Sequence, residues 1–391
     1  MSRRTRLIIV ATLCVAVVVL LLFFVGRFRT SEQAKANAAQ RQRISRFDDP
    51  TLEITELAKN SDVPYSRVLA DFREWAQYPQ DSRPLNPEDI DQLRFEKIEL
   101  PLTPMPIIEN EKPKEPEHAC VLQAESHTAY EDTQHETQLR CQNLKTGKFV
   151  LPDVKGVKLT RTAGTGTFNS PPPDIVKNDS GAMASVSFFF RPRSQDWGDM
   201  ELTVDFSLPE RGLMPHQLKT HFFSSPQAPA KFTGKFRDRL DTGSLVIAVE
   251  IQVRLPGSYR IEGNLMSDDG QPLAHARADA RLAGGSTWVD LQFFGKIIRD
   301  KRIPGPYKLT SVRGQQMNLP INPDDLTLPP EQVARILAAT EQTEPPKRAM
   351  LPWLGEFKTE RYAVSQFSDA EYDSEFKRER LAELERLAAG Q

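Results

Sequence analysis

The sequence predicts a mainly β fold: two β-sandwiches in tandem, an N-terminal transmembrane helix and short flanking helices. Three observations predict it. An unbroken apolar run extends from Leu7 to Val25, two later regions alternate apolar and polar residues, and the 391 residues include 30 prolines. The first pattern is typical of a membrane-spanning helix and the second of antiparallel sheets with one solvated face. The prolines favour turns and linkers over long helices.

The apolar run is long enough to cross a bilayer, because its 19 residues at ~1.5 Å each match the ~30 Å hydrocarbon core. A cleaved signal peptide is the main alternative, but its apolar core is usually shorter, and the nearest Ala-x-Ala, at residues 36–38, lies well beyond the run. A lipoprotein signal needs small residues before Cys14, and a twin-arginine signal prefers an apolar residue where Arg6 stands. We therefore expect residues 1–30 to be an N-terminal tail and an uncleaved anchor.

Topology and cysteine content indicate the same compartment. A short N-terminal tail stays in the cytoplasm more easily than a long domain, so we expect a bacterial inner-membrane protein whose body lies in the periplasm or outside the cell. The flanking arginines alone do not decide the orientation. Only Cys120 and Cys141 lie outside the apolar run. This even pair is consistent with one disulfide in an oxidising compartment, and two buried free thiols are the alternative.

Two short regions follow the anchor. Residues 31–60 are polar and predict a juxtamembrane stalk. Residues 61–100 predict a short helical segment. One helix has Asp62 as its N-cap and Pro64 early in its first turn, and Asn86–Asp89 starts a second short helical turn. The first helix has an apolar stripe, which we expect to dock on the following domain; binding to a partner is the alternative.

The first β region covers residues 101–225. It opens with a linker or edge segment rich in proline and glutamate, residues 100–118. The two cysteines are expected on neighbouring strands around a polar loop, a spacing that suits a disulfide between them. Clearer alternation at Ala184–Phe190 and Leu202–Leu208 predicts two antiparallel strands.

The second β region, residues 226–325, alternates more strongly. Apolar residues occupy every second position from Leu245 to Leu255, and shorter alternating runs follow, separated by turn signals such as Asp268–Gly270. At least five strands over about 90 residues predict an immunoglobulin-like or fibronectin-like sandwich. The C-terminal extension, residues 326–391, predicts a short helix at Glu331–Ala339 and another that Ser374 opens and that ends at Ala389. The latter is too short for a coiled coil, so docking or fraying is expected.

The segments GSYRIEGNLMSDDGQPLAHA (Gly257–Ala276) and STWVDLQFFGKIIRDKRIPGPYKL (Ser286–Leu309) resemble an immunoglobulin-like β-sandwich module of an uncharacterised family of bacterial exported or membrane-anchored proteins. The segments WAQYPQDSRPLNPEDID (Trp75–Asp91) and YAVSQFSDAEYDSEFKRERLAEL (Tyr362–Leu384) resemble flanking motifs of similar proteins. The resemblance covers about half of the chain. It implies an envelope location and a sandwich fold, and it brings no catalytic residues.

No catalytic, cofactor-binding or metal-binding residue is expected. His127 and His135 share the loop between the cysteines with several acids, but they lack the tight pairs of zinc sites, so a solvated polar loop is the interpretation. The acids at residues 369–373 lack the glycine and glutamate that a calcium loop needs at its sixth and twelfth positions. The sequence contains no glycine-rich phosphate loop, nucleophile elbow or HExxH motif.

One basic cluster is expected to be a solvated turn; contact with an anionic glycan, a lipid headgroup or a protein partner is the alternative. Its members are Phe294, Lys296, Arg299, Lys301 and Arg302. With a net charge of −2, no nucleic-acid partner is expected.

The sequence thus favours a membrane-anchored, extracytoplasmic structural or binding protein of the bacterial envelope, which presents its sandwiches to a protein or glycan partner. The alternative is an envelope enzyme, such as a hydrolase, whose active site is assembled from residues far apart in the sequence. A deep polar cleft with convergent carboxylates or histidines would favour the enzyme, and flat sandwich faces would favour binding.

Overall fold

The structure is a computed structural model that describes residues 64–96, 99–109, 112–163, 166–180, 183–208, 215–317, 328–339 and 347–390. The predicted anchor, Leu7 to Val25, and the predicted stalk, residues 31–60, lie outside these ranges. Within them, no helix has both the length and the apolar character that a membrane crossing requires. The chain is mainly β, which confirms the predicted class. It divides into a smaller unit that combines the chain up to Gln77 with Asp373 onward, and a larger unit, Tyr78–Tyr372.

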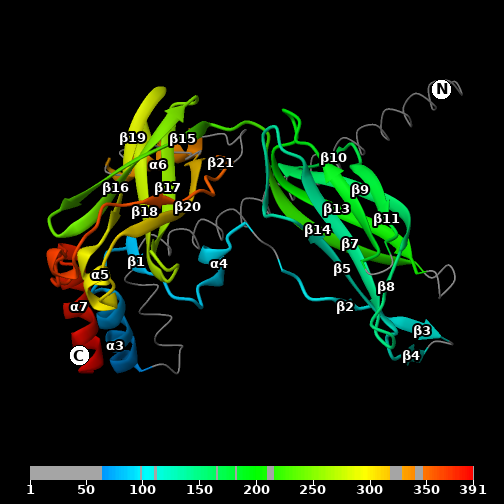
Figure 1. Ribbon diagram of the computed structural model, residues 1–391, viewed down its shortest axis with the longest axis horizontal. Helices are drawn as coiled ribbons and strands as arrows, with labels where there is room; N and C mark the ends of the chain where they lie inside the picture. The colour runs from blue at the N-terminus through cyan, green and yellow to red at the C-terminus, as the bar shows by residue number, and fades with distance from the viewer. Residues whose placement is uncertain are drawn as a thin grey trace, which may run out of the picture. The chain divides into compact units, whose positions relative to one another are not determined.

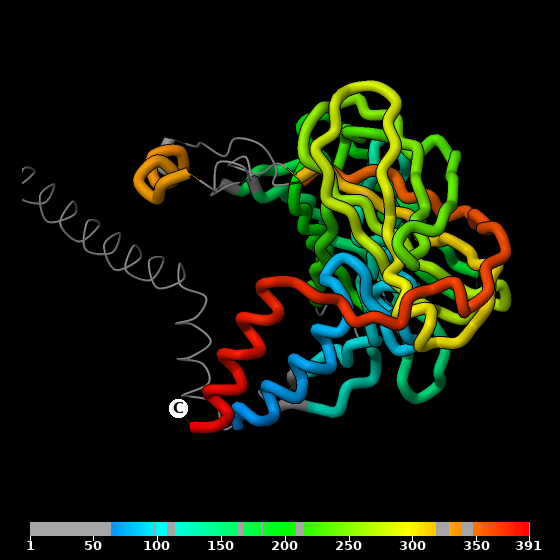
Figure 2. Tube along the Cα trace, turned by 90° about the vertical axis from the view of Figure 1, so that its left-hand side faces the viewer, coloured from blue at the N-terminus to red at the C-terminus, as the bar shows by residue number. Residues whose placement is uncertain are grey.

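The described part of the smaller unit is a pair of helices, α3 (Tyr65–Trp75) and α7 (Glu375–Ala388), which lie side by side (Figures 1 and 2). Each helix buries one leucine, Leu69 in α3 and Leu384 in α7. An ion pair of 2.6 Å between Arg73 and Glu385 joins their exposed sides. The apolar stripe of α3 therefore has a partner helix from the opposite end of the chain.

The predicted starts of the helices near residues 64, 331 and 374 are confirmed to within a residue or two, whereas the turn predicted to start at Asn86 is a helix, α4 (Ile90–Leu93), that starts only at Ile90. The Ser374 hydroxyl accepts a hydrogen bond from the backbone N–H of Lys377, which caps α7 as the sequence predicts. For α3, Pro64 occupies the N-cap position instead of Asp62, and no side chain caps the helix. The predicted helix at 331–339 is α6 (Pro330–Ala339), in the larger unit.

The larger unit contains two β-sandwiches. The strands of the first are β2 (Thr103–Pro104), β5 (His118–Ala124), β6 (Thr128–Tyr130), β7 (His135–Asn143), β8 (Phe149–Val150), β9 (Asp153–Ala163), β10 (Gly166–Ser170), β11 (Asp174–Asn178), β12 (Ser185–Phe190), β13 (Gly198–Ser207) and β14 (His216–Ser225), beside a small hairpin of β3 (Ile107–Glu109) and β4 (Lys112–Lys114). One sheet has the order β11-β12-β7-β5-β2, with β8 beside β7, and the other has the order β10-β9-β13-β14-β6. Alternate residues of both sheets, such as Phe188 and Phe206, meet in one apolar core.

The second sandwich consists of β1 (Ser82–Pro84), β15 (Ala230–Asp241), β16 (Ser244–Val253), β17 (Gly257–Ser267), β18 (Pro272–Leu282), β19 (Gly285–Phe293), β20 (Tyr307–Met317), β21 (Lys347–Ala349) and β22 (Phe357–Lys358), with α4 (Ile90–Leu93), α5 (Gly295–Lys301) and the 3₁₀ turn η3 (Val364–Gln366). A sheet ordered β15-β16-β19 faces a sheet ordered β1-β18-β17-β20-β21, where β22 also pairs with β20 (Figure 1). The predicted core face of β16 is confirmed, because Ile247, Val249 and Ile251 are fully buried between the sheets. The predicted solvated face is wrong for the first half of the strand, where Val246 and Ala248 are buried as well.

Candidate functional site

The predicted disulfide is confirmed. Cys120 of β5 and Cys141 of β7 stand directly opposite each other on adjacent antiparallel strands, with a Cα–Cα distance of 4.1 Å, and their sulfurs are bonded. Both cysteines are fully buried in the first core. The bond therefore links two residues that are 21 positions apart in the sequence and lie on adjacent strands of one sheet.

The predicted basic cluster lies on a short helix, α5, so the expectation of a turn at this position is wrong. Phe294 packs against the second core and makes an edge contact with Tyr372, with 6.4 Å between ring centres. Lys296 pairs with Asp300, one turn later on α5, at 3.2 Å.

The other cations of the cluster also contact the chain itself. Arg299 donates a hydrogen bond to the backbone carbonyl of Val364 at 3.1 Å. Lys301 donates to the side-chain oxygen of Asn86 at 2.8 Å. Arg302 ends the helix in a left-handed conformation, with φ of 57°, and is exposed. Partner binding by this cluster stays a prediction, and Arg302 is the cation of the four that the structure presents most openly.

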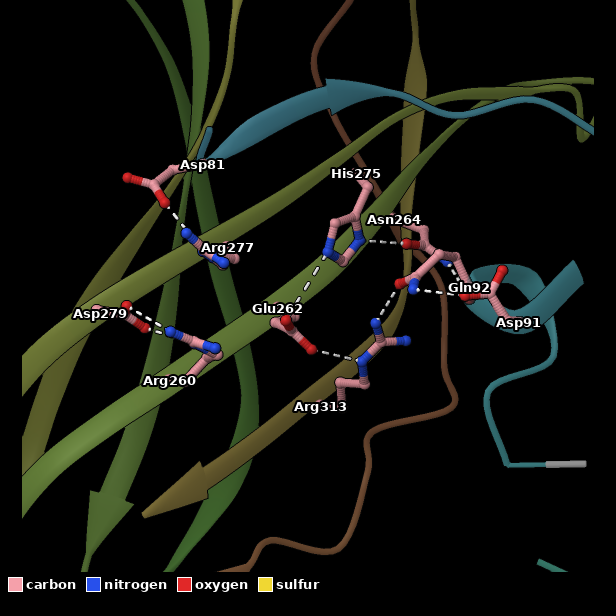
Figure 3. A network of polar contacts seen from close by, with 10 residues as sticks. All are labelled: Asp81, Asp91, Gln92, Arg260, Glu262, Asn264, His275, Arg277, Asp279 and Arg313. Carbon is pink, nitrogen blue, oxygen red and sulfur yellow. Dashed lines mark hydrogen bonds and ion pairs between the residues drawn. The ribbon is translucent and has the colours of Figure 1, made fainter. Parts of the chain in front are cut away.

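A second polar group was not predicted. It lies on the outer face of the sheet formed by β18, β17 and β20 (Figure 3). Strand alternation places it there, because Tyr259, Ile261 and Leu265 of β17 are buried in the core, and Glu262 and Asn264 between them point away from it. Residues 90–96, which include α4, cover part of this face through the contacts described below.

An ion pair between Glu262 and Arg313 forms the centre of the network. The Arg313 Nε donates to the Glu262 carboxylate at 2.7 Å, and its Nη2 donates to the side-chain oxygen of Gln92. The guanidinium also lies over the ring of Phe95, at 4.7 Å from its centre. The side chains of Arg313 and Glu262 are 16% and 23% exposed, so the pair is largely shielded from water. The Nη1 atom of Arg313 is buried and has no hydrogen-bond partner among the residues that the structure describes.

The protonation of His275 follows from its neighbours. Asn264 donates from its Nδ2 to the backbone carbonyl of Gln92 at 2.8 Å, so its Oδ1 faces His275. The His275 Nδ1 must then carry the proton that it shares with this oxygen at 2.9 Å. The remaining nitrogen, Nε2, is an acceptor and lies 3.9 Å from the Glu262 carboxylate.

The pKa of His275 is lowered to about 4: burial is the largest cause, the Arg313 guanidinium acts in the same direction, and the Glu262 carboxylate opposes the shift. His275 is therefore neutral near pH 7. Two further ion pairs lie near the His275 Nε2 and the Glu262 carboxylate. Arg260 donates two hydrogen bonds of 2.8 Å to Asp279, and Arg277 donates one of 2.9 Å to Asp81. The hydrogen bond from Arg260 holds the pKa of Asp279 below its usual value.

This arrangement favours a structural role for these side chains over a role in proton transfer. A histidine whose pKa is about 4 is a weak base at neutral pH, and the nearby carboxylate is neutralised by a guanidinium. In the described ranges, no group of three or more histidines, cysteines or acids is placed to hold a metal ion. The hydrogen bonds of this network hold residues 90–96 against the outer face of the sheet.

A second buried histidine lies in the first sandwich, where the expectation of a solvated polar loop is wrong for it. His135 begins β7 and is buried, whereas His127 is exposed. The imidazole packs against the ring of Phe222, with 4.4 Å between centres, and its Nε2 finds no partner within the described part of the chain. Burial lowers the pKa of His135 to about 4.

Comparison with known proteins gives no family. No protein-family model matches the chain, and no curated protein matches it. Among solved structures, it is similar to a DUF4785 family protein of Legionella pneumophila, with 15% identity and a TM-score of 0.36 over 51% of this chain and 52% of that one. Domains from titin match with 9% identity and a TM-score of 0.18, over 58% and 60% of the two chains. The adhesin InvE of Yersinia pseudotuberculosis matches with 12% identity and a TM-score of 0.15, over 50% and 54%. The chain thus spans about half the length of the Legionella protein, and its sandwich fold is assigned from its own sheets and cores.

Proposed function

We propose that the chain is a membrane-anchored structural or binding protein of the bacterial envelope, which presents immunoglobulin-like sandwiches to a protein or glycan partner outside the cytoplasm. The observation that carries the proposal is the disulfide between Cys120 and Cys141, buried between directly paired strands. Such bonds persist in oxidising compartments and are rare in a reducing cytosol. The apolar run Leu7 to Val25 supplies the anchor in this proposal.

The polar network supports binding or scaffolding over catalysis. Glu262 and Arg313 bind each other, Asn264 and His275 bind each other, and Gln92 joins both pairs. These side chains hold one segment of the chain against a sheet, which keeps the outer surface of the sandwich fixed. A fixed surface suits recognition, because little conformational freedom is lost when a partner binds.

The first experiment tests the compartment. Alkaline phosphatase, which needs disulfides to fold, is fused after Gln391 and expressed in a bacterial host. We expect phosphatase activity in a membrane fraction that resists a high-salt wash. A β-galactosidase fusion at the same position, active only in the cytosol, is the matched control. An active β-galactosidase fusion with an inactive phosphatase fusion would contradict the proposal.

The second experiment tests the partner. A photo-crosslinking amino acid replaces Arg302 in the full chain, and the same residue replaces Arg281, an exposed arginine of β18, as a control. In intact cells, the Arg302 position should give a discrete adduct that the Arg281 position does not. Equal labelling at both positions, or none at either, would show that α5 is not the surface that contacts the partner.

One observation favours an enzyme as the second candidate. The His275 Nε2 and the Glu262 carboxylate converge to 3.9 Å, and a hydroxyl or water between them would meet two acceptors. If the chain hydrolyses an envelope substrate there, Glu262→Gln and His275→Gln should each abolish turnover and leave adduct formation at Arg302 unchanged. If the unaltered chain forms the adduct but shows no turnover, the enzyme is excluded and the binding function stands.

A further inference from the structure

Strand β11 is an open edge of the first sandwich. It pairs with β12 along its whole length, from Asp174 opposite Phe189 to Asn178 opposite Ser185, and no strand of the described ranges lies on its other side. All five of its residues are exposed. Ile175 and Val176 are 45% and 51% exposed, so apolar side chains project from both faces of the strand.

Two of the other edges, β2 and β15, carry features that discourage pairing with another chain. Strand β2 is two residues long and includes Pro104. Strand β15 is interrupted by a bulge at Gly234, which has φ of 79°. Strand β11 has neither a proline nor a bulge, and its registers with β12 run without a shift.

We infer that β11 is a self-association edge: two copies of this chain pair antiparallel through β11, so that the sheets of two first sandwiches join across a two-fold axis at Val176. An exposed row of backbone N–H and C=O groups is the usual template for such pairing. In a two-fold antiparallel pair, facing residues must point to the same side of the sheet, so their numbers differ by an even amount. An axis at Val176 satisfies this condition.

The side chains of β11 are compatible with their own copies in this register. Val176 faces Val176 of the second copy, which pairs two half-exposed apolar groups. Ile175 faces the aliphatic stem of Lys177, and the Asp174 carboxylate faces the Asn178 amide, which can donate to it. No two charges of the same sign stand directly opposite each other. Centring the axis on Lys177 would oppose two ammonium groups, so that register is disfavoured.

The paired surface is small. Five residues from each copy bury less than the ~1,000 Å² that a stable interface usually needs, so self-association is expected to be reversible and concentration-dependent. It does not depend on the proposed function, because it concerns contact between copies and not the identity of another partner.

Cysteine crosslinking of the full chain tests the register. Cys14→Ser removes the cysteine outside the disulfide, and Val176→Cys is then added. Mild oxidation in cells should give a dimer on a non-reducing gel, because facing residues of an antiparallel pair have Cβ atoms about 5 Å apart. Leu144→Cys, at a side chain that is 48% exposed away from β11, is the matched control and should stay monomeric.

Sedimentation of the purified full chain in detergent tests the affinity. Val176→Lys would oppose two ammonium groups and should raise the dissociation constant of the dimer about tenfold or more. Thr167→Lys on the neighbouring edge strand β10 places the same charge on an exposed residue and should leave the constant unchanged.

Two results would overturn the inference. One is a single-copy mass at every protein concentration together with no Val176→Cys dimer. The other is a Val176→Cys adduct of a different mass, which would show that a strand of another protein occupies this edge.

Discussion

The two sandwiches are held together by different means. The first contains a disulfide at the centre of its core, between β5 and β7. The second contains no cysteine, and its core includes a continuous set of fully buried side chains from β16, β17, β19 and β20. Its outer face adds the ion pair of Glu262 and Arg313. Covalent closure and apolar burial are thus alternative sources of stability within one chain.

The buried histidines extend the comparison. Burial lowers the pKa of both His135 and His275 to about 4. His135 reaches this value beside Phe222 through burial alone, whereas His275 has an arginine and a carboxylate as neighbours that act in opposite directions. A shifted pKa is therefore no sign of a functional site by itself, and the neighbours decide what the imidazole can do.

The largest expected effect is loss of the disulfide. Replacing both Cys120 and Cys141 with alanine removes a constraint on the unfolded chain, and for a loop of this length the first sandwich should lose about 3.5 kcal/mol. Hydrogen exchange by mass spectrometry should show faster exchange in β5 and β7 with no change in β16 and β17. Reductant added to the unaltered chain should reproduce the effect. Equal acceleration in both sandwiches would show that they unfold as one body and break the comparison.

Acidification should destabilise both sandwiches. Below pH 6.5 the unfolded histidines bind protons, but the folded ones, with pKa values of about 4, do not. The unfolded state therefore binds more protons, and stability falls as pH drops from about 6.5 to about 4, by up to about 3 kcal/mol for each histidine. Hydrogen exchange of β7 and of β18 at pH 7 and pH 4.5 measures the two effects separately.

His135→Leu and His275→Gln separate the two contributions. The first should flatten the pH dependence in β7 only, because the His135 Nε2 has no partner in the described residues and leucine can pack on Phe222. The second should flatten it in β18 only. An unchanged pH slope in either variant would mean that another group titrates in that sandwich.

The sequence was informative where patterns are local. The core-facing positions of β16, the turn before β18 and the cap of α7 each involve residues close in the chain, and the structure confirms all three. Strand β15 was missed because its alternation breaks at Gly234, where the register with β16 shifts between Phe232 and Phe236. The α5 helix was missed because a run of seven residues with several charges looks like a turn.

The polar network had a partial signal in the sequence. The predicted turn at Asp268–Gly270 fixes a hairpin in which Asn264 stands opposite His275, so that pair could have been proposed from the register alone. Arg313 and Gln92 could not, because they are 221 residues apart and meet only once the sheet has formed. Depth of burial, which sets the pKa of His275, depends on the same tertiary contacts.

Smaller effects distinguish the shielded ion pair from an exposed one. Glu262→Gln leaves the Arg313 guanidinium with a weaker acceptor and should cost the second sandwich about 1–2 kcal/mol. Asp290→Asn, which breaks a pair with Arg239 whose side chains are about half exposed, should cost no more than about 0.5 kcal/mol. Urea unfolding measures both, and equal costs for the two variants would contradict the role given to Glu262.

Glu262→Gln should also lower the pKa of His275, because the carboxylate that favours the imidazolium is gone. NMR titration measures this pKa, and a raised value would contradict the same role.

The first sandwich has its own shielded acid, Asp196, and its loss should cost less than the loss of Glu262. Burial would raise the pKa of Asp196, but hydrogen bonds from Arg193, at 2.6 and 2.9 Å, and from Ser170, at 3.0 Å, outweigh burial and lower it. The stability it contributes is present above the unfolded pKa and fades as pH falls through the folded one. Arg193 lies only three residues away, so Asp196→Asn should loosen one loop and cost about 1 kcal/mol, less than the cross-strand pair of the second sandwich. Hydrogen exchange confined to residues 191–197 is the expected result, and acceleration throughout β12 and β13 would mean that this loop is coupled to the sheets as tightly as Glu262 is.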